Sequence, residues 1–293
     1  MKHKISVTFV LLLMFLVAQI IGLFVIRSYS GKTLPYGMQP PEMKPEITIS
    51  SILIAIFLAV SFVLILMKIK ANWILRIWFF SVVAIALAIT FNAFFQGFVP
   101  SSHVFALALG VILSFIKVFK RDILVHNLTE LFIYPGIAAI LVPLLGIWSI
   151  SLLLLSISLY DIYAVWHAGF MQEMAKYQIK ELKFFAGFFV PYLPKSIAKS
   201  AKPSKSKKFQ KIRVNLALLG GGDVIFPILA AGVFLNLFGI IPALIVSFFA
   251  TIGLLYLFVM AEKGKFYPAM PFIAAGCFVG FLAVYLLKLA SLF

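Results

Sequence analysis

The sequence predicts an all-α polytopic membrane protein with nine transmembrane helices. Apolar residues make up 63% of the 293 residues and charged residues only 12%, a balance that does not fit a soluble domain of this length. Apolar stretches of about 20 residues, the length that crosses the hydrocarbon core of a bilayer, recur from one end of the chain to the other. We therefore expect one membrane domain.

The nine expected spans cover residues 5–26, 48–67, 73–98, 102–119, 128–145, 147–166, 216–238, 241–260 and 268–291. The first is too long for a signal peptide and lacks a small-x-small cleavage site, so we expect it to be retained. Pro135 and Pro143 interrupt the fifth span, which membrane helices tolerate when neighbours satisfy the freed carbonyls.

The distribution of basic residues predicts the orientation. The side that holds the N-terminus carries 21 of the 25 Lys and Arg residues, against four on the other side. The bias persists when the eleven Lys and Arg residues of the long loop between the sixth and seventh spans (167–215) are left out. The N-terminus is therefore expected in the cytoplasm and the C-terminus outside. A basic rim beside anionic lipid explains the net charge of +16, and a nucleic-acid partner is not expected.

These spans divide the chain into three parts: a six-helix bundle (1–166), a basic cytoplasmic loop (167–215) and a three-helix bundle (216–293). Within the loop, residues 171–190 carry Met, Tyr, Ile, Leu and Phe side chains interspersed with Lys and Glu, which predicts a basic amphipathic helix on the inner membrane surface. Residues 194–208 are rich in Lys, Ser, Ala and Pro, which predicts a flexible linker. The linker is interpreted as a tether, with a site of self-cleavage or regulation as the alternative.

Two aspartates interrupt apolar spans with no basic residue beside them. Asp161 lies in the sixth span and Asp223 in the seventh, and an ionisable residue in a membrane segment indicates a functional site. With the predicted orientation, each lies roughly 8 to 11 Å below the cytoplasmic boundary, at about 1.5 Å per residue. Neighbouring antiparallel helices would therefore bring the two carboxyls to the same depth.

Two adjacent carboxyls can act together on water. Because both cannot ionise cheaply at close range, one stays protonated as an acid while the other acts as a base, as peptide hydrolysis requires. No metal and no cofactor is needed for this chemistry. Paired carboxyls also suit a proton or cation relay, so a transporter or channel is the alternative.

Two further motifs suit this role. Gly220, Gly221 and Gly222 precede Asp223 and leave room for the close approach of a substrate backbone or a facing helix. The ninth span begins with Pro268-Ala269-Met270-Pro271. Its prolines leave backbone carbonyls without helical partners, which suits the binding of an unwound peptide.

The ordered set Tyr160-Asp161, G-x-G-D at 220–223 and P-A-x-P at 268–271 resembles the presenilin and signal peptide peptidase family of intramembrane aspartyl proteases. The resemblance covers residues 150–293 well. It implies a presenilin-like fold, Asp161 and Asp223 as the catalytic pair, and a P-A-x-P segment that shapes the site. The family usually has Leu at the position of Met270, which bears on substrate preference. Tyr160 either hydrogen-bonds near the carboxyls or packs.

The predicted orientation matches presenilins and is opposite to that of signal peptide peptidases. It favours protein substrates whose transmembrane segment has its N-terminus outside. The short loops favour a compact microbial, in particular archaeal, homologue in the cell membrane of a prokaryote. No obligatory partner subunit is expected, and a homo-oligomer is left open.

Other classes of site fit less well. A prepilin-type peptidase also uses G-x-G-D, but nine spans and the P-A-x-P motif argue against it, and a catalytically silent scaffold is the remaining alternative. The sequence has no H-E-x-x-H and no G-x-S-G, which disfavours a zinc or serine protease. His126 and Glu130, four residues apart, are interpreted as an interfacial hydrogen-bonded or solvated pair because no further metal ligands accompany them.

Overall fold

The computed structural model describes residues 5–38, 45–120, 122–167, 186–192, 215–262 and 267–290. The α-helices are α1 (Ile5–Tyr29), α2 (Pro45–Lys68), α3 (Asn72–Phe95), α4 (Ser102–Phe115), α5 (Ile123–Leu141), α6 (Ile147–Trp166), α9 (Gly221–Phe238), α10 (Ile240–Met260) and α11 (Met270–Leu289). Short 3-10 segments η1 (Pro35–Gly37) and η3 (Val142–Leu144), a π-helical segment η2 (Ile116–Lys120) and two strands, β1 (Gly187–Tyr192) and β2 (Asn215–Gly220), complete the described fold.

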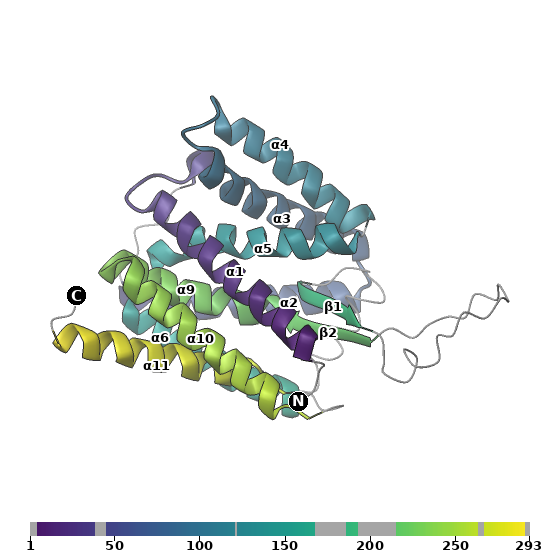
Figure 1. Ribbon diagram of the computed structural model, residues 1–293. Helices are drawn as coiled ribbons and strands as arrows, with labels where there is room; N and C mark the ends of the chain where they lie inside the picture. Colours follow the sequence, from purple (N-terminus) through teal and green to yellow (C-terminus); the bar gives the residue numbers. More distant parts are fainter. Residues whose placement is uncertain are drawn as a thin grey trace, which may run out of the picture.

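The helices form one bundle in which α1 lies between two groups (Figure 1). Helices α3, α4 and α5 pack together on one side of α1, and α9, α10 and α11 pack together with α6 on the other. The beginning of α1 lies at the same end of the bundle as the strands, and the end of α11 lies at the opposite end (Figure 1). Helix α9 contacts both groups through α1, α5 and α6.

Eight helices in the described ranges are long and apolar enough to cross a membrane. They correspond to eight of the nine expected spans. The remaining expected span, 48–67, falls on α2. The apolar part of α2 that qualifies, Phe57–Lys68, is shorter than a full span, so this span stays a prediction. The fifth span begins earlier than expected, at Ile123, because Asp122 caps α5 by accepting a 2.9 Å hydrogen bond from the Val125 N–H.

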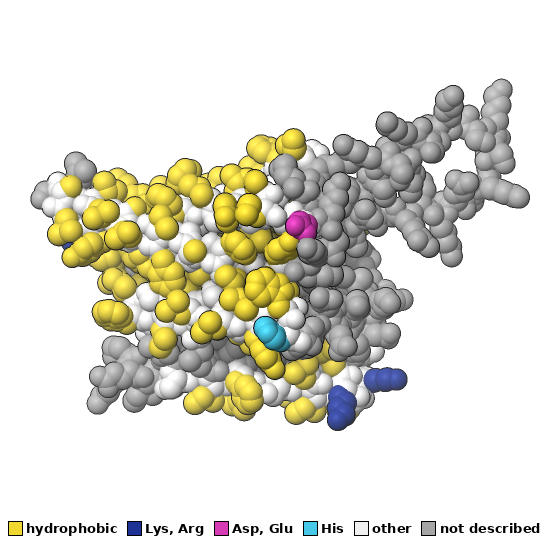
Figure 2. All heavy atoms as spheres, turned by 90° about the horizontal axis from the view of Figure 1, so that it is seen from below, with side chains coloured by type: hydrophobic (Ala, Val, Ile, Leu, Met, Phe, Trp, Pro, Cys, Tyr) yellow, Lys and Arg dark blue, Asp and Glu magenta, His cyan; other side chains and the backbone are white. Residues whose placement is uncertain are grey.

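The surface of the bundle is apolar. Hydrophobic side chains cover most of the described part of the face in Figure 2, and the few charged side chains visible there are scattered at its margin. Large residues such as Phe57, Trp73 and Leu282 are more than half exposed. Exposing so continuous an apolar surface to water is unfavourable, whereas contact with lipid chains carries no such free-energy penalty.

The two strands form an antiparallel hairpin that the all-α prediction missed. Gly187 pairs with Gly220, and Tyr192 pairs with Asn215 at the other end of the ladder. The expected amphipathic helix at 171–190 is wrong for residues 187–190, where Phe188, Phe189 and Val190 favour an extended strand. The rest of that segment and the linker at 194–208 lie outside the described residues.

The same hairpin corrects the start of the seventh span. Residues 216–220 belong to β2, so α9 begins at Gly221 and not at 216. Pairing with β1 along the whole of β2 stabilises the extended conformation of these residues. Asp223 therefore lies in the first turn of its helix and not two turns inside it.

Helices α10 and α11 pack at backbone distance through glycines. A side chain at Gly276 of α11 would meet the Phe249 carbonyl oxygen of α10, and one at Gly253 of α10 would meet the Phe272 carbonyl oxygen of α11. Small residues at such contacts are the usual basis of tight helix packing in membranes. The pairing holds α11, and with it the P-A-x-P segment, in a fixed position.

We predict that Gly276→Ala lowers the free energy of unfolding by about 1–3 kcal/mol, since the added methyl group must push two backbones apart. Thermal unfolding of the purified protein in detergent measures the effect. Gly146→Ala is the matched control because open space surrounds Gly146. An equal unfolding midpoint for the two variants would contradict the close packing of α10 on α11.

Candidate active site

Asp161 lies on α6, five residues before its end, and only 6% of its surface is exposed. Its Oδ2 atom accepts a 3.0 Å hydrogen bond from the Met270 N–H, the first residue of α11. The residue before α11, Ala269, has no side chain that can cap the helix. Asp161 therefore caps α11 from a different helix, and the positive end of the α11 dipole faces a carboxyl.

Asp223 is half-buried in the first turn of α9. Helix α9 packs against α6, and the Asp161 and Asp223 carboxyls are close enough to interact electrostatically. The Met270 hydrogen bond adds the P-A-x-P segment to the same place. The fold thus gathers three motifs that are spread over more than 100 residues of the sequence.

The three glycines before Asp223 have different surroundings. A side chain at Gly221 would lie 2.6 Å from the Tyr134 hydroxyl oxygen and 2.8 Å from its ring, so a tyrosine of α5 occupies the space that this glycine leaves. Gly220 pairs with Gly187 at the end of the hairpin. Gly222 is exposed, with only one side chain, Phe226, near it. The close neighbour at Gly221 is therefore the Tyr134 side chain of α5, and the approach of a substrate backbone stays a prediction.

The other predicted site residues lie nearby on α6 and α11. Pro271 is in the first turn of α11, where a missing N–H costs no helical hydrogen bond, and Met270 is buried. Pro268 and Ala269 precede that turn. Tyr160 is next to Asp161 and 42% exposed, and its role stays a prediction.

Sequence reasoning missed two contacts that hold the site. Gln19 of α1 is fully buried, and its Nε2 donates a 3.2 Å hydrogen bond to the carbonyl of Val224, the residue after Asp223. A lone amide in an apolar span is a sequence signal for a helix–helix hydrogen bond. The second contact is Tyr134, which no pattern distinguishes from an ordinary packing aromatic.

The interpretation of His126 and Glu130 is half right. Both are hydrogen-bonded, but they are buried in the protein and not solvated at an interface. Their partner is Lys117, whose Nζ lies 2.5 Å from Glu130 Oε1 and 3.1 Å from His126 Nδ1. Within the described ranges, no group of three or more His, Cys, Asp or Glu side chains is placed to bind a metal ion.

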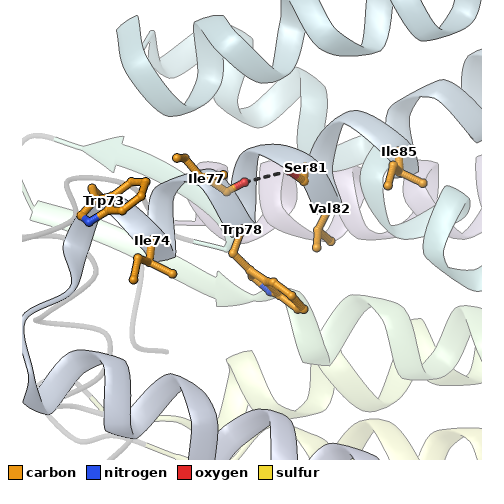
Figure 3. A pocket seen from close by; sticks show the side chains of 7 residues that line it. All are labelled: Trp73, Ile74, Ile77, Trp78, Ser81, Val82 and Ile85. Atoms are coloured by element: carbon orange, nitrogen blue, oxygen red, sulfur yellow. Dashed lines mark hydrogen bonds between the residues drawn. The ribbon is translucent and has the colours of Figure 1, made fainter.

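An open apolar pocket of about 520 Å³ lies elsewhere, along one face of α3 (Figure 3). Its side chains, including Trp73, Trp78 and Ile85, all come from that helix. The Ser81 hydroxyl donates a 3.0 Å hydrogen bond to the Ile77 carbonyl within the helix. The pocket shares no residue with the site around Asp161.

Comparison with known proteins gives the family. The family model described as signal-peptide peptidase, presenilin aspartyl protease matches residues 12–289. Two crystal structures of a presenilin family intramembrane aspartate protease, in space groups C222 and P2, share the fold. Each has a TM-score of 0.63 and 17% identity over 94% of this chain, which matches 97% and 96% of the solved chains. No curated protein sequence matches.

The match of the family model to nearly the whole chain confirms the resemblance first drawn from three short motifs. The eight apolar helices and the shared fold establish an integral, multi-pass membrane protein with a presenilin-like architecture. This chain belongs to the signal-peptide peptidase and presenilin family of aspartyl proteases.

Proposed function

We propose that this protein is a GxGD-type aspartic endopeptidase that hydrolyses peptide bonds within the transmembrane segments of other membrane proteins, with Asp161 and Asp223 as its catalytic pair. One observation carries the proposal: Asp161 on α6 accepts a hydrogen bond from the first N–H of α11, and Asp223 lies within electrostatic range of Asp161 on the adjacent helix α9. The family to which the chain belongs supports the same chemistry.

In this mechanism the two carboxyls hold one proton between them. The ionised carboxyl takes a proton from a water molecule, whose oxygen attacks the carbonyl carbon of the scissile peptide bond. The protonated carboxyl gives its proton to the carbonyl oxygen. Collapse of the tetrahedral intermediate breaks the C–N bond: the carboxyl that took a proton from water gives it to the leaving nitrogen, and one hydroxyl of the intermediate returns its proton to the other carboxyl. The products are a carboxylic acid and an amine, and both carboxyls return to their starting states. No cofactor enters these steps.

The P-A-x-P segment is proposed to bind the substrate. A transmembrane helix hides its amides in internal hydrogen bonds, so it must unwind locally before cleavage. Pro268 and Pro271 lack N–H groups, and carbonyls near them are left without helical donors. Such carbonyls accept hydrogen bonds from an extended substrate strand. Met270 stands at the position where the family usually has Leu and is proposed to influence which substrates fit.

The orientation and location belong to the same proposal. The start of α1 and the end of α11 lie at opposite ends of the bundle (Figure 1), which supports an odd number of spans. The excess of Lys and Arg on the side that holds the N-terminus supports a cytoplasmic N-terminus and an external C-terminus. Substrates would then have their own N-termini outside. We propose that the enzyme works in the cell membrane of a prokaryote, archaeal in particular, without an obligatory partner subunit.

We predict that Asp161→Asn and Asp223→Asn each lower the rate of cleavage by at least 10²-fold, since each removes one partner of the acid–base pair. The purified protein is incubated with a panel of single-span membrane peptides, and the fragments are identified by mass spectrometry. Asn at 161 can still accept the Met270 hydrogen bond, so the fold is expected to survive.

Asp122→Asn is the matched control because it removes a carboxyl but preserves the α5 cap. Cleavage within the apolar part of the peptides should persist in this variant. Fragments that persist in both the 161 and 223 variants would contradict the catalytic pair. Proton flux into liposomes that both variants abolish, without any fragments, would favour the ion relay.

We predict that Lys32→Cys reacts with an impermeant maleimide added outside intact cells, whereas Lys68→Cys reacts only after the membrane is opened. Both positions are exposed, and Cys277, the native thiol, is buried and should contribute little background. The unmodified protein, labelled under the same conditions, measures that background. The reverse pattern would place the N-terminus outside.

A further inference from the structure

Four buried polar side chains near the site have no part in the chemistry described above. Lys117 is in η2, and His126, Glu130 and Tyr134 follow one another at four-residue intervals on α5, which places them on one face of that helix. Each is at most 5% exposed. An ion pair buried in a membrane protein is costly unless every hydrogen-bonding group in it is satisfied.

The hydrogen-bonding roles in this cluster are mutually consistent. The Lys117 ammonium group can only donate, so it donates to Glu130 Oε1 at 2.5 Å and to His126 Nδ1 at 3.1 Å. Nδ1 therefore has no proton, and His126 Nε2–H donates to the Gly187 carbonyl at 2.9 Å. The Tyr134 hydroxyl donates to Glu130 Oε2. The ammonium and the carboxylate neutralise each other, and the imidazole is neutral.

One end of the cluster reaches the hairpin. The Gly187 carbonyl that accepts from His126 belongs to the residue paired with Gly220, the last residue before α9. Two residues on, Phe189 exchanges hydrogen bonds of 2.8 and 3.1 Å with the Asn127 side chain and stacks on His126 at 4.3 Å. Helix α5 thus holds the outer edge of β1.

The other end of the cluster reaches the turn that carries Asp223. The Tyr134 hydroxyl and ring occupy the space above Gly221, two residues before Asp223, and Tyr134 and Asp223 are close enough to interact electrostatically. The Gly221 N–H also donates to the Ala186 carbonyl at 3.1 Å, which extends the hairpin ladder into the turn. Both faces of the turn are therefore held, one by the hairpin and one by Tyr134.

We propose that Lys117, Glu130, His126 and Tyr134 are positioning residues for Asp223, with the ion pair fixing Tyr134 and His126, which in turn fix the strand-to-helix turn. This inference rests on the proposed protease function. If the Tyr134 side chain could rotate freely, no side chain of α5 would hold the first turn of α9 in place, and Asp223 could shift toward α5. Displacing a reacting group by about 1 Å costs on the order of 10²-fold in rate.

Tyr134→Phe is the first test. The ring that fills the space above Gly221 is kept, but the hydrogen bond that orients it is lost. We expect kcat to fall about 10- to 100-fold, with KM for the peptide within about twofold of the wild-type value, since the substrate-binding groups are unchanged. Tyr29→Phe is the matched control because Tyr29 also has a buried hydroxyl, hydrogen-bonded to Ile89 and Asn92 of α3 at the last residue of α1. That control should leave kcat unchanged.

A double variant separates positioning from stability. Lys117→Met with Glu130→Leu replaces the ion pair with apolar side chains of similar volume, a change that often leaves stability unaltered. We expect a thermal midpoint close to that of the wild type and a kcat as low as that of Tyr134→Phe, because Tyr134 has lost its acceptor. Glu130→Gln keeps an acceptor and should recover part of the activity that Glu130→Ala loses.

Hydrogen exchange provides a readout that does not need substrate. In Tyr134→Phe and in His126→Ala, the amides of residues 187–190, 192 and 216–223 should exchange at least about tenfold faster than in the wild type. If the wild type cleaves peptides and Tyr134→Phe matches its kcat, the positioning role is overturned, whatever the exchange shows. If the wild type cleaves nothing, the proposed function fails and this inference fails with it. An unchanged kcat in Tyr134→Phe, by contrast, overturns only the positioning role and leaves the catalytic pair untouched.

Discussion

A carboxyl group inside a bilayer must find hydrogen-bond donors in the protein, and Asp161 finds one at the N-terminus of α11. That single contact ties the sixth span to the P-A-x-P segment and satisfies a backbone N–H that Ala269 has no side chain to cap. The remaining architecture keeps this contact in place. Helix α10 fixes α11 through glycine contacts, and α9 packs against α6 so that Asp223 comes within electrostatic range of Asp161.

The position of Asp223 is set by the junction between strand β2 and helix α9. Asp223 follows a strand directly and lies in the first turn of its helix, so its position depends on how the turn is held. Three elements hold it: the hairpin through Gly220 and Gly221, α1 through the Gln19 hydrogen bond to Val224, and α5 through Tyr134. Glycine at 221 is then a steric requirement, since any larger residue would displace Tyr134.

Much of this fold follows from composition and spacing, because a span needs about 20 apolar residues and few other structures tolerate them. Asp161 and Asp223 stand out in the sequence because a carboxyl in an apolar span is costly and usually has a functional role, and their role as a catalytic pair stays a proposal. The hairpin could not be predicted from the sequence, since β1 lies within a basic amphipathic stretch and β2 continues without interruption into an apolar span. Lys117 was also missed, because nothing local indicates that a basic residue near a span end points inward to Glu130. Such long-range pairings depend on how helices pack, which single-sequence patterns do not encode.

The most direct test of the account is the distance between positions 161 and 223. With both aspartates replaced by cysteine and Cys277 replaced by alanine, a short bifunctional thiol reagent should join the two positions within one chain. Digestion and mass spectrometry would then show a linked pair of peptides from α6 and α9, absent from either single-cysteine variant. Complete labelling of both thiols as separate adducts, with no linked pair at any reagent concentration, would contradict a shared acid–base site.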